Sequence, residues 1–224
     1  MSLKDKICIV TGAAQGIGLA TSLKCAQEGA VVIVCDMKAD AVDAAVTRCQ
    51  ALAGAADGYL VNVTDRAQVE AMIEAVKAKY GRIDVLVNNA GITKDARLAK
   101  MTLDQFDAVI DVNLRGVFHC AQAVAETMTA QGAGVILNAS SVVGIYGNFG
   151  QTNYGAAKAG IAGFTRCLAL GGKKYGIRVN AIAPVALTRL TEDLGGFQDE
   201  SLKTKMSPAH IAPLIVYLAS DLSK

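Results

Sequence analysis

The feature that most constrains the fold is a regular alternation between short apolar runs and longer amphipathic segments. The apolar runs are rich in Val, Ile and Leu, as strands buried on both faces of a parallel sheet are. Between them, apolar residues recur at helical spacing. This alternation predicts one α/β domain over residues 1–224, a doubly wound parallel sheet with helices on both faces. The predicted strands are 7–10, 31–35, 59–63, 83–87, 134–137 and 177–183.

Composition excludes several classes of protein. With 224 residues, 52% of them hydrophobic and 19% charged, the chain can bury one sizeable core. A net charge of +2 with mixed signs offers no surface for nucleic acid. The apolar runs are too short to span a membrane, and Lys4 to Lys6 lead straight into a strand where a secretory signal would be apolar, so a cytoplasmic protein is expected. The six cysteines form no Cys-x-x-Cys, and His119 and His210 are isolated, which predicts reduced thiols and no metal site.

The first predicted strand runs into a glycine-rich turn and a helix. The turn reads Thr-Gly-Ala-Ala-Gln-Gly-Ile-Gly over residues 11–18, and the next strand ends on Asp36. Glycines let the backbone approach a pyrophosphate, a helix N-terminus attracts its charge, and an acid at this distance can bind a ribose diol. The segment predicts a dinucleotide site. Its candidate contacts are Gly12, Gln15, Gly16, Ile17, Gly18 and Asp36.

Asp36 also bears on which dinucleotide is bound. Its carboxylate would repel a 2′-phosphate, and no arginine follows it or stands at Gln15. NAD is therefore predicted in preference to NADP. Lys38 is the one nearby cation that argues the other way, and a solvated strand end is the alternative interpretation of Asp36.

Two further polar features follow predicted secondary structure. Asn-Asn-Ala-Gly at 88–91 ends the fourth predicted strand, where a doubly wound sheet has its ligand crevice, although an ordinary Asn-rich turn has the same composition. Asn113 interrupts the apolar stripe of one long helix predicted from a capping box at Thr102 and Gln105 to Met128. A carboxamide turned inward needs partners, so Asn113 either pins backbone or ends a proton path.

The stretch from residue 138 to 158 carries the candidate chemistry. Ser140 and Ser141 end a strand, and Tyr154 and Lys158 begin a helix. Residues four apart share a helix face, so the Lys158 ammonium can lie beside the Tyr154 phenol and lower its pKa toward the working pH. Such a phenol can exchange a proton with a substrate. Alone, a Tyr-x-x-x-Lys pair is more often ordinary helix surface.

In combination, these motifs resemble the signature of the short-chain dehydrogenase/reductase family over nearly the whole chain. The segments Asn-Asn-Ala-Gly-Ile-Thr-Lys-Asp and Ser-Val-Val-Gly are similar to those of 3-oxoacyl-[acyl-carrier-protein] reductases. The resemblance implies a Rossmann fold and hydride transfer between NAD(H) and a ketone or secondary alcohol, with a 3-oxoacyl thioester as one candidate. It implies that Tyr154 is the general acid/base and that Lys158 lowers its pKa and holds the nicotinamide ribose. Ser141 would bind the substrate oxygen, and Asn113 would hold a water that links Lys158 to solvent.

The resemblance implies more contacts and also shows departures. The further nucleotide contacts would be Asn62, Val63, Asn89, Ala90, Gly91, Tyr154, Lys158, Pro184 and Thr188. Position 62 is Asn where the family commonly has Asp, and Val185 follows proline where glycine is usual, so that loop is expected to take another path. A substrate lid is expected at 190–205, and the usual last strand is absent after residue 220. Family members are usually oligomers, so a homo-oligomer is expected, with the helices of Asn113 and Tyr154 at one interface.

Two other functions remain open from sequence. The first is a hydroxysteroid, sugar or polyol dehydrogenase of the same family, which a substrate panel would distinguish. The second is a catalytically silent nucleotide-binding protein; the intact Ser141, Tyr154 and Lys158 argue against it, and the absent last strand argues for it. A phosphate-binding NTPase is disfavoured because no Gly-Lys-Ser/Thr follows a glycine turn.

Overall fold

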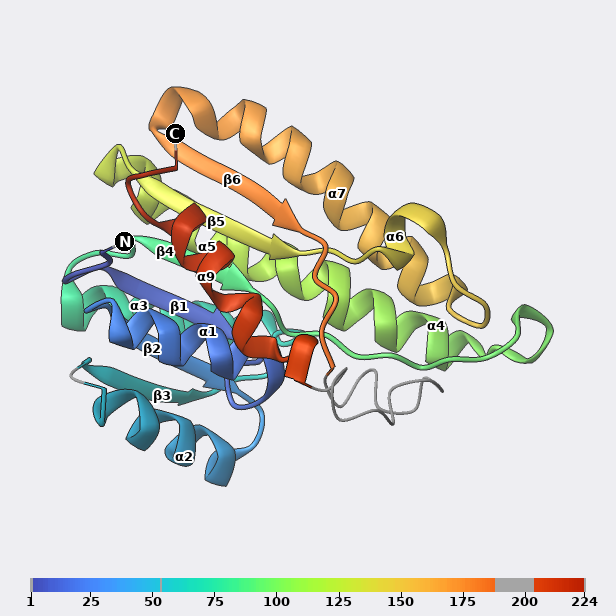
Figure 1. Ribbon diagram of the computed structural model, residues 1–224. Helices are drawn as coiled ribbons and strands as arrows, with labels where there is room; N and C mark the ends of the chain where they lie inside the picture. The colour runs from blue at the N-terminus through green and yellow to red at the C-terminus, as the bar shows by residue number, and fades with distance from the viewer. Residues whose placement is uncertain (1, 53, 188–203, 224) are drawn as a thin grey trace.

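A six-stranded parallel sheet forms the centre of the computed structural model, which describes residues 2–52, 54–187 and 204–223. The strand order is β3-β2-β1-β4-β5-β6 (Figure 1). The strands are β1 (Ile7–Thr11), β2 (Val31–Asp36), β3 (Ala56–Leu60), β4 (Val85–Asn88), β5 (Gly134–Ala139) and β6 (Ile177–Ile182). The predicted doubly wound parallel sheet is confirmed. The order reverses between β1 and β4, which is where sheets of this kind bind ligands.

Helices cover both faces of the sheet (Figure 1). On one face pack α1 (Gly16–Gln27), α2 (Ala39–Gln50) and α9 (Ala212–Ala219). On the other pack α3 (Arg66–Tyr80), α5 (Gly116–Gln131) and α7 (Thr152–Gly172). The shorter elements are η1 (Leu98–Lys100), α4 (Leu103–Ile110), η2 (Asp111–Arg115), α6 (Val143–Tyr146), η3 (Lys173–Tyr175) and η4 (Pro208–His210).

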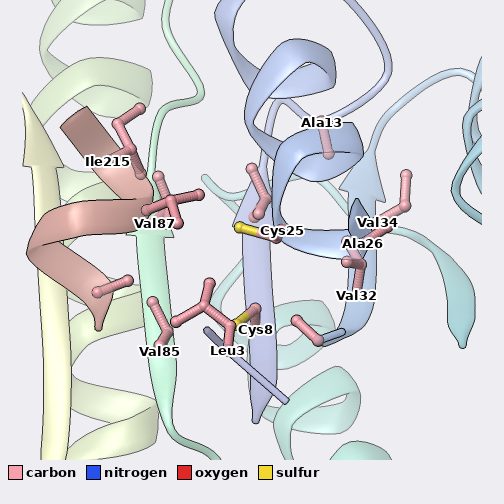
Figure 2. Packing of buried hydrophobic residues seen from close by; sticks show 14 of the residues in the cluster. Leu3, Cys8, Ala13, Cys25, Ala26, Val32, Val34, Val85, Val87 and Ile215 are labelled. Carbon is pink, nitrogen blue, oxygen red and sulfur yellow. The ribbon is translucent and has the colours of Figure 1, made fainter. Parts of the chain in front are cut away.

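The strands supply both hydrophobic cores by alternation. In β1, Cys8 and Val10 point into one core, and Ile7 and Ile9 point into the other. Figure 2 shows the first core, in which strand side chains meet Cys25 and Ala26 of α1 and the side chain of Ile215. Because such a strand is buried on both faces, its sequence is a continuous apolar run.

Two predicted elements differ most from the structure in their limits. The third strand was expected at 59–63, but β3 spans Ala56–Leu60, with Gly58 paired to Val34. The helix expected from residue 102 to 128 begins at the predicted capping box, but the π-helical turn η2 divides it into α4 and α5. Phe118, placed on its inward stripe by the sequence pattern, is 43% exposed.

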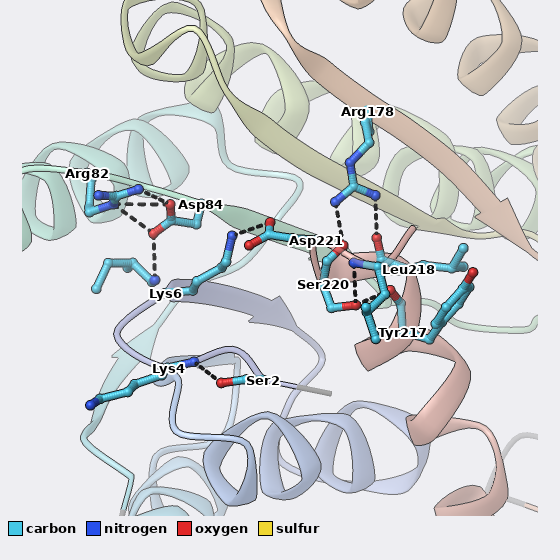
Figure 3. A network of polar contacts seen from close by, with 12 residues as sticks. Ser2, Lys4, Lys6, Arg82, Asp84, Arg178, Tyr217, Leu218, Ser220 and Asp221 are labelled. Atoms are coloured by element: carbon cyan, nitrogen blue, oxygen red, sulfur yellow. Dashed lines mark hydrogen bonds and ion pairs between the residues drawn. The ribbon is translucent and has the colours of Figure 1, made fainter. Parts of the chain in front are cut away.

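A carboxylate ties the amino ends of two strands together. Asp84 is 7% exposed and accepts a hydrogen bond of 2.9 Å from the backbone N–H of Ile7. The guanidinium of Arg82 donates to both oxygens of the same carboxylate (Figure 3). Removing this carboxylate would leave a buried N–H and a cation without their acceptor.

The C-terminal segment is fastened at the same edge of the sheet (Figure 3). Arg178 of β6 donates hydrogen bonds of 2.8 Å to the carbonyl oxygens of Leu218 and Ser220. These carbonyls end α9, where a cation is favourable. Lys6 also forms an ion pair of 2.8 Å with Asp221. The two ends of the described chain therefore lie side by side.

The described part of the chain lacks two features. There, no helix combines the length and apolar character needed to cross a membrane. The same residues contain no cluster of three His, Cys, Asp or Glu side chains arranged for a metal. Five of the six cysteines are buried thiols, as predicted, whereas Cys167 is exposed.

Candidate active site

The glycine turn fits closely against the loop that follows β4. Gly12 has a φ of +62°, a conformation that favours glycine. A Cβ atom on Gly18 would overlap the carbonyl oxygen of Gly12, and one on Gly12 would lie 2.9 Å from the Cα of Ala90. Side chains at these two positions would push the first turn of α1 away from the sheet. The turn therefore requires glycine, as the dinucleotide prediction assumed.

Thr11 and Asn89 fasten the two sides of this crevice together. The Oγ1 atom of Thr11 accepts hydrogen bonds from the N–H groups of Asn89 and Ala90 at 3.0 and 3.1 Å. In return, the Nδ2 atom of Asn89 donates to the carbonyl oxygens of Thr11 and Gly12 at 3.0 and 3.1 Å. The segment Asn89–Gly91 thus lies against the glycine turn.

The N-terminus of α1 faces the crevice. The helix begins at Gly16, directly after the turn. Its N-cap is Gln15; within the described residues no side chain caps the helix, and its first turn has no acidic residue. The first N–H groups of a helix lack intrahelical partners and carry positive partial charge, so this end can bind an anion.

A cavity of about 300 Å³ lies beside the turn, and Asp36 stands on its wall. The Asp36 carboxylate accepts hydrogen bonds from the N–H of Ala14 at 3.1 Å and of Met37 at 2.7 Å. A carboxylate has about four acceptor positions, so it keeps capacity for a further donor. Predicted contacts that line the cavity are Gly12, Gln15, Asp36, Asn62, Val63, Ala90 and Gly91, and Lys38 lines it too.

Asn62 lines the cavity, and its side-chain oxygen is hydrogen-bonded within the protein. Its side-chain oxygen accepts from the N–H and the hydroxyl of Thr64, at 3.0 and 2.9 Å. This oxygen, the atom of Asn62 able to accept from an adenine amino group, is therefore already engaged. The neighbouring carbonyl of Val63 accepts from Nδ1 of His119 at 3.0 Å.

Ser141, Tyr154 and Lys158 meet beyond the carboxyl end of β5. The side chain of Ser141 is hydrogen-bonded to that of Tyr154. The Nζ atom of Lys158 lies 5.5 Å from the centroid of the Tyr154 ring and donates to the carbonyl oxygen of Ala139 at 2.6 Å. By contrast, Ser140 turns away and donates to the backbone carbonyl of Lys158 at 2.7 Å. The structure thus brings together the three residues predicted for proton transfer, and it separates the two serines.

Burial governs the charges in this group. Burial lowers the pKa of Lys158 to about 8. Burial also raises the pKa of Tyr154; the hydrogen bond from Ser141 acts in the opposite direction, and the charge of Asp95 adds to the rise. The direction is opposite to the lowering predicted from the Tyr-x-x-x-Lys spacing. The physical reason is that the phenolate loses its hydration, while the ammonium is held at Ala139.

Asn113 is completely buried in the π-helical turn η2. Its carboxamide accepts from the N–H of Ile92 and donates to the carbonyl of the same residue, both at 2.8 Å. A Cβ atom on Gly91 would lie 2.9 Å from Oδ1 of Asn113 and 3.6 Å from Nζ of Lys158, so both groups border Gly91. The side chain therefore pins the backbone after β4, and it does so beside Lys158. Short π-helical turns are frequent at functional sites.

A polar pair beside Tyr154 was not predicted from the sequence. The Nε2 atom of Gln151 donates to a carboxylate oxygen of Asp95 at 2.8 Å. Asn153 donates to the carbonyl of Lys94 at 3.0 Å and accepts from the N–H of Tyr154 at 2.8 Å. The available signal was the polar run Gln-Thr-Asn immediately before the tyrosine.

The loop after β6 is described only in part. Pro184 is half-buried and Val185 is exposed. Among the described residues, Asp5 is the only non-glycine with a positive φ, so Val185 does not take the conformation open to glycine. Thr188 and residues 190–203 of the expected lid lie outside the described residues.

The sequence of this chain is similar to those of known proteins. A family model described as short chain dehydrogenase matches residues 6–196. The chain is 49% identical to the 3-oxoacyl-[acyl-carrier-protein] reductase FabG of Thermotoga maritima, over all of this chain and 94% of that protein. It is 43% identical to the 3-oxoacyl-[acyl-carrier-protein] reductase of Synechocystis, over 98% of this chain and 91% of that protein.

Solved structures agree with the fold. Levodione reductase superposes with a TM-score of 0.91 at 34% identity, covering 98% of this chain and 92% of that one. A xylitol dehydrogenase with bound NAD⁺ superposes with a TM-score of 0.90 at 30% identity, covering all of this chain and 95% of that one.

Proposed function

Because the chain belongs to the short-chain dehydrogenase/reductase family, and is thus an oxidoreductase acting on CH–OH or carbonyl groups, we propose that it transfers a hydride between NAD(H) and a ketone or secondary alcohol. One observation carries the proposal. Ser141, Tyr154 and Lys158 converge at the edge of the sheet that also holds the glycine turn and its cavity. A proton donor and a nucleotide site at one edge are what this reaction requires.

The residues present fit a dinucleotide. The cavity of about 300 Å³, the close approach of Gly12 and Gly18 and the uncapped start of α1 support a bound pyrophosphate. The proposed contacts are Gly12, Gln15, Gly16, Ile17, Gly18, Asp36, Asn62, Val63, Asn89, Ala90, Gly91, Tyr154, Lys158 and Pro184. When bound, a nicotinamide supplies or accepts the hydride.

The side chains of this protein handle the proton and the substrate oxygen. In reduction, Tyr154 gives its phenolic proton to the oxygen as the carbonyl carbon is reduced, and in oxidation it takes that proton back. Ser141 is the second group proposed to bind the oxygen, since its hydroxyl is already hydrogen-bonded to Tyr154. At pH values below about 8, Lys158 places a cation 5.5 Å from the centroid of the phenol ring, and it is proposed to hold the nicotinamide ribose. Asn113 keeps the loop after β4 in register and is proposed to help hold a water beside Lys158.

A 3-oxoacyl thioester is the proposed substrate. Support comes from the relatives of 49% and 43% identity, whose names state that activity. A polyol is the second candidate, because the xylitol dehydrogenase matches with a TM-score of 0.90.

NAD(H) is the proposed cofactor because the Asp36 carboxylate lines the cavity and would repel a 2′-phosphate. Lys38 lines the same cavity, so NADPH is the necessary comparison.

The test is the loss of nicotinamide absorbance with acetoacetyl-CoA and either NADH or NADPH, with Tyr154→Phe as the control. Oxidation of NADH that depends on Tyr154 is the expected result. Faster turnover with NADPH would reverse the cofactor proposal and leave the reaction class intact. A parallel assay with NAD⁺ and xylitol tests the polyol alternative. If both nucleotides bind and no carbonyl or alcohol turns over, the silent nucleotide-binding function replaces the enzymatic one.

A homo-oligomer is proposed as the working form. Leu103 of α4, Phe118 of α5 and Leu170 of α7 are 79%, 43% and 81% exposed, and these are the helices expected at an interface. Light scattering during size exclusion would measure the mass, and a mass of 23.2 kDa would contradict the proposal.

A further inference from the structure

The loop after β4 is fastened to the start of α7 by three hydrogen bonds. The carbonyl of Lys94 accepts from Asn153 at 3.0 Å, and the N–H of Ala96 donates to the carbonyl of Gly150 at 2.9 Å. Between them, Oδ2 of Asp95 accepts from Nε2 of Gln151 at 2.8 Å. The loop therefore presents its one carboxylate to the first residues of this helix.

Gln151 fixes the position of that carboxylate. The residue is 5% exposed, and its side-chain oxygen accepts from Nδ2 of Asn148 at 3.0 Å. Because the Asp95 carboxylate can only accept, it is the NH₂ group of the Gln151 amide that points to it. Gln151 is the N-cap of α7, directly before the first turn of the helix, on which Tyr154 lies. The Asp95 carboxylate is thus held beside the first turn of α7.

We propose that Asp95, oriented by Gln151, is a positioning residue that sets the proton affinity of the Tyr154 hydroxyl and with it the pH range of turnover. This inference rests on the proposed function of Tyr154. In the described part of the chain, the groups that face this phenol are the Lys158 ammonium from α7, the Asp95 carboxylate from the loop after β4 and the uncharged hydroxyl of Ser141 from the loop after β5.

The sign of the effect follows from charge. A carboxylate near the phenol disfavours tyrosinate, and the charge of Asp95 is among the causes that raise the pKa of Tyr154. Alcohol oxidation needs tyrosinate, so removing the charge moves the rise of the oxidation rate to lower pH. Ketone reduction needs the phenol, so its decline moves to lower pH as well. Asp95 is exposed to solvent, and salt therefore screens the effect.

The decisive variant is Asp95→Asn, which keeps an acceptor for Gln151 and removes the charge. Tyrosinate absorbance is followed against pH, with Tyr154→Phe subtracted to isolate this one of the six tyrosines. The expected result is a titration about half a pH unit lower at low salt, with the difference shrinking as salt is added. Asp104→Asn, which removes an exposed carboxylate from α4, is the matched control and leaves the titration unchanged.

A second variant separates charge from orientation. Gln151→Met keeps the Asp95 carboxylate but removes the group that holds it, so a smaller shift in the same direction is expected. The pH profile of kcat should move with the titration in both variants. If Asp95→Asn titrates like the parent protein at low salt, the inference is overturned. Because this titration needs no turnover, an inactive parent enzyme would refute the proposed function alone.

Discussion

The ammonium of Lys158 is held by the carbonyl oxygen of Ala139, at 2.6 Å, and not by the hydroxyl of Tyr154. A strand end therefore positions the cation that the sequence pattern assigned to the phenol. The ring of Tyr154 still lies 5.5 Å from this charge. Both residues belong to α7, and the last residue of β5 fixes where the ammonium lies.

Lys158→Met should make the protein more stable while reducing its turnover. Burial lowers the pKa of Lys158 from 10.5 to about 8, so the unfolded chain binds more protons between these values. Stability of the parent protein therefore rises with pH through this window, and below it the buried charge costs free energy. Below pH 8, we expect Lys158→Met to raise the free energy of unfolding by about 1–3 kcal/mol. This net value allows for the loss of the hydrogen bond to Ala139. Urea unfolding at pH values on both sides of this pKa checks the prediction, and an identical pH slope in both proteins would contradict it.

Tyr154→Phe should fold and bind nucleotide but lose turnover by about 10²–10⁴-fold, the usual contribution of a general acid or base. The substitution removes only the hydroxyl that meets Ser141. Steady-state rates and nucleotide titration by fluorescence measure the two effects separately. Retention of most of the turnover would remove Tyr154 from the proton-transfer step.

Asp36→Ala should lower kcat/KM for NADH more than kcat/KM for NADPH. The carboxylate is proposed to accept from the ribose diol, and a hydrogen bond to a charged group contributes about 1.5–3 kcal/mol, or roughly 10- to 150-fold in kcat/KM. Lys38→Ala is the matched control on the same cavity wall. Equal losses for both nucleotides in Asp36→Ala would undo the ribose assignment.

Gly18→Ala should abolish nucleotide binding, whereas Gly163→Ala should not. The added methyl group at position 18 would overlap the carbonyl of Gly12, so the start of α1 must shift. At Gly163, inside α7, an added Cβ meets nothing within 4 Å, and alanine should stabilise the helix by about 0.4–1 kcal/mol. Isothermal titration and thermal melting distinguish the two variants. Parent-like affinity in Gly18→Ala would show that the turn tolerates a side chain.

Asp84→Ala should lower the free energy of unfolding by about 2–4 kcal/mol, because it leaves the N–H of Ile7 and the guanidinium of Arg82 without their acceptor. Asp221→Ala is the control. Its side chain is 82% exposed, so loss of its pair with Lys6 should cost about 0–1 kcal/mol. Chemical denaturation of both variants gives the comparison, and equal losses would mean that burial of Asp84 has no effect.

The fold could be predicted from sequence because strand and helix periods differ so clearly in this chain. The limits of β1 and β2 were predicted almost to the residue, because each strand is a continuous apolar run that ends on one polar residue. β3 was misplaced because it is an edge strand with the composition Ala-Asp-Gly-Tyr-Leu, and its pairing with β2 decides its limits. The π-helical turn at Asn113 has no periodic signature, so the division between α4 and α5 could not be foreseen.

The candidate site could be predicted as a set of residues and only partly as a set of contacts. Spacing alone placed Tyr154 beside Lys158, but it gave no measure of burial, which raises the phenol pKa. The pairing of Gln151 with Asp95 spans 56 residues of sequence. Contacts between residues so far apart in sequence depend on where loops from different strands meet. Local sequence patterns do not encode these meeting points.

Lys6 and Asp221 lie 2.8 Å apart at the amino edge of the sheet, and all six strands run from that edge toward the opposite one. The turn at Gly81, between α3 and β4, lies at this same edge and is exposed. An exposed turn tolerates insertions, so a reporter domain could be inserted there on the side of the sheet opposite to Tyr154.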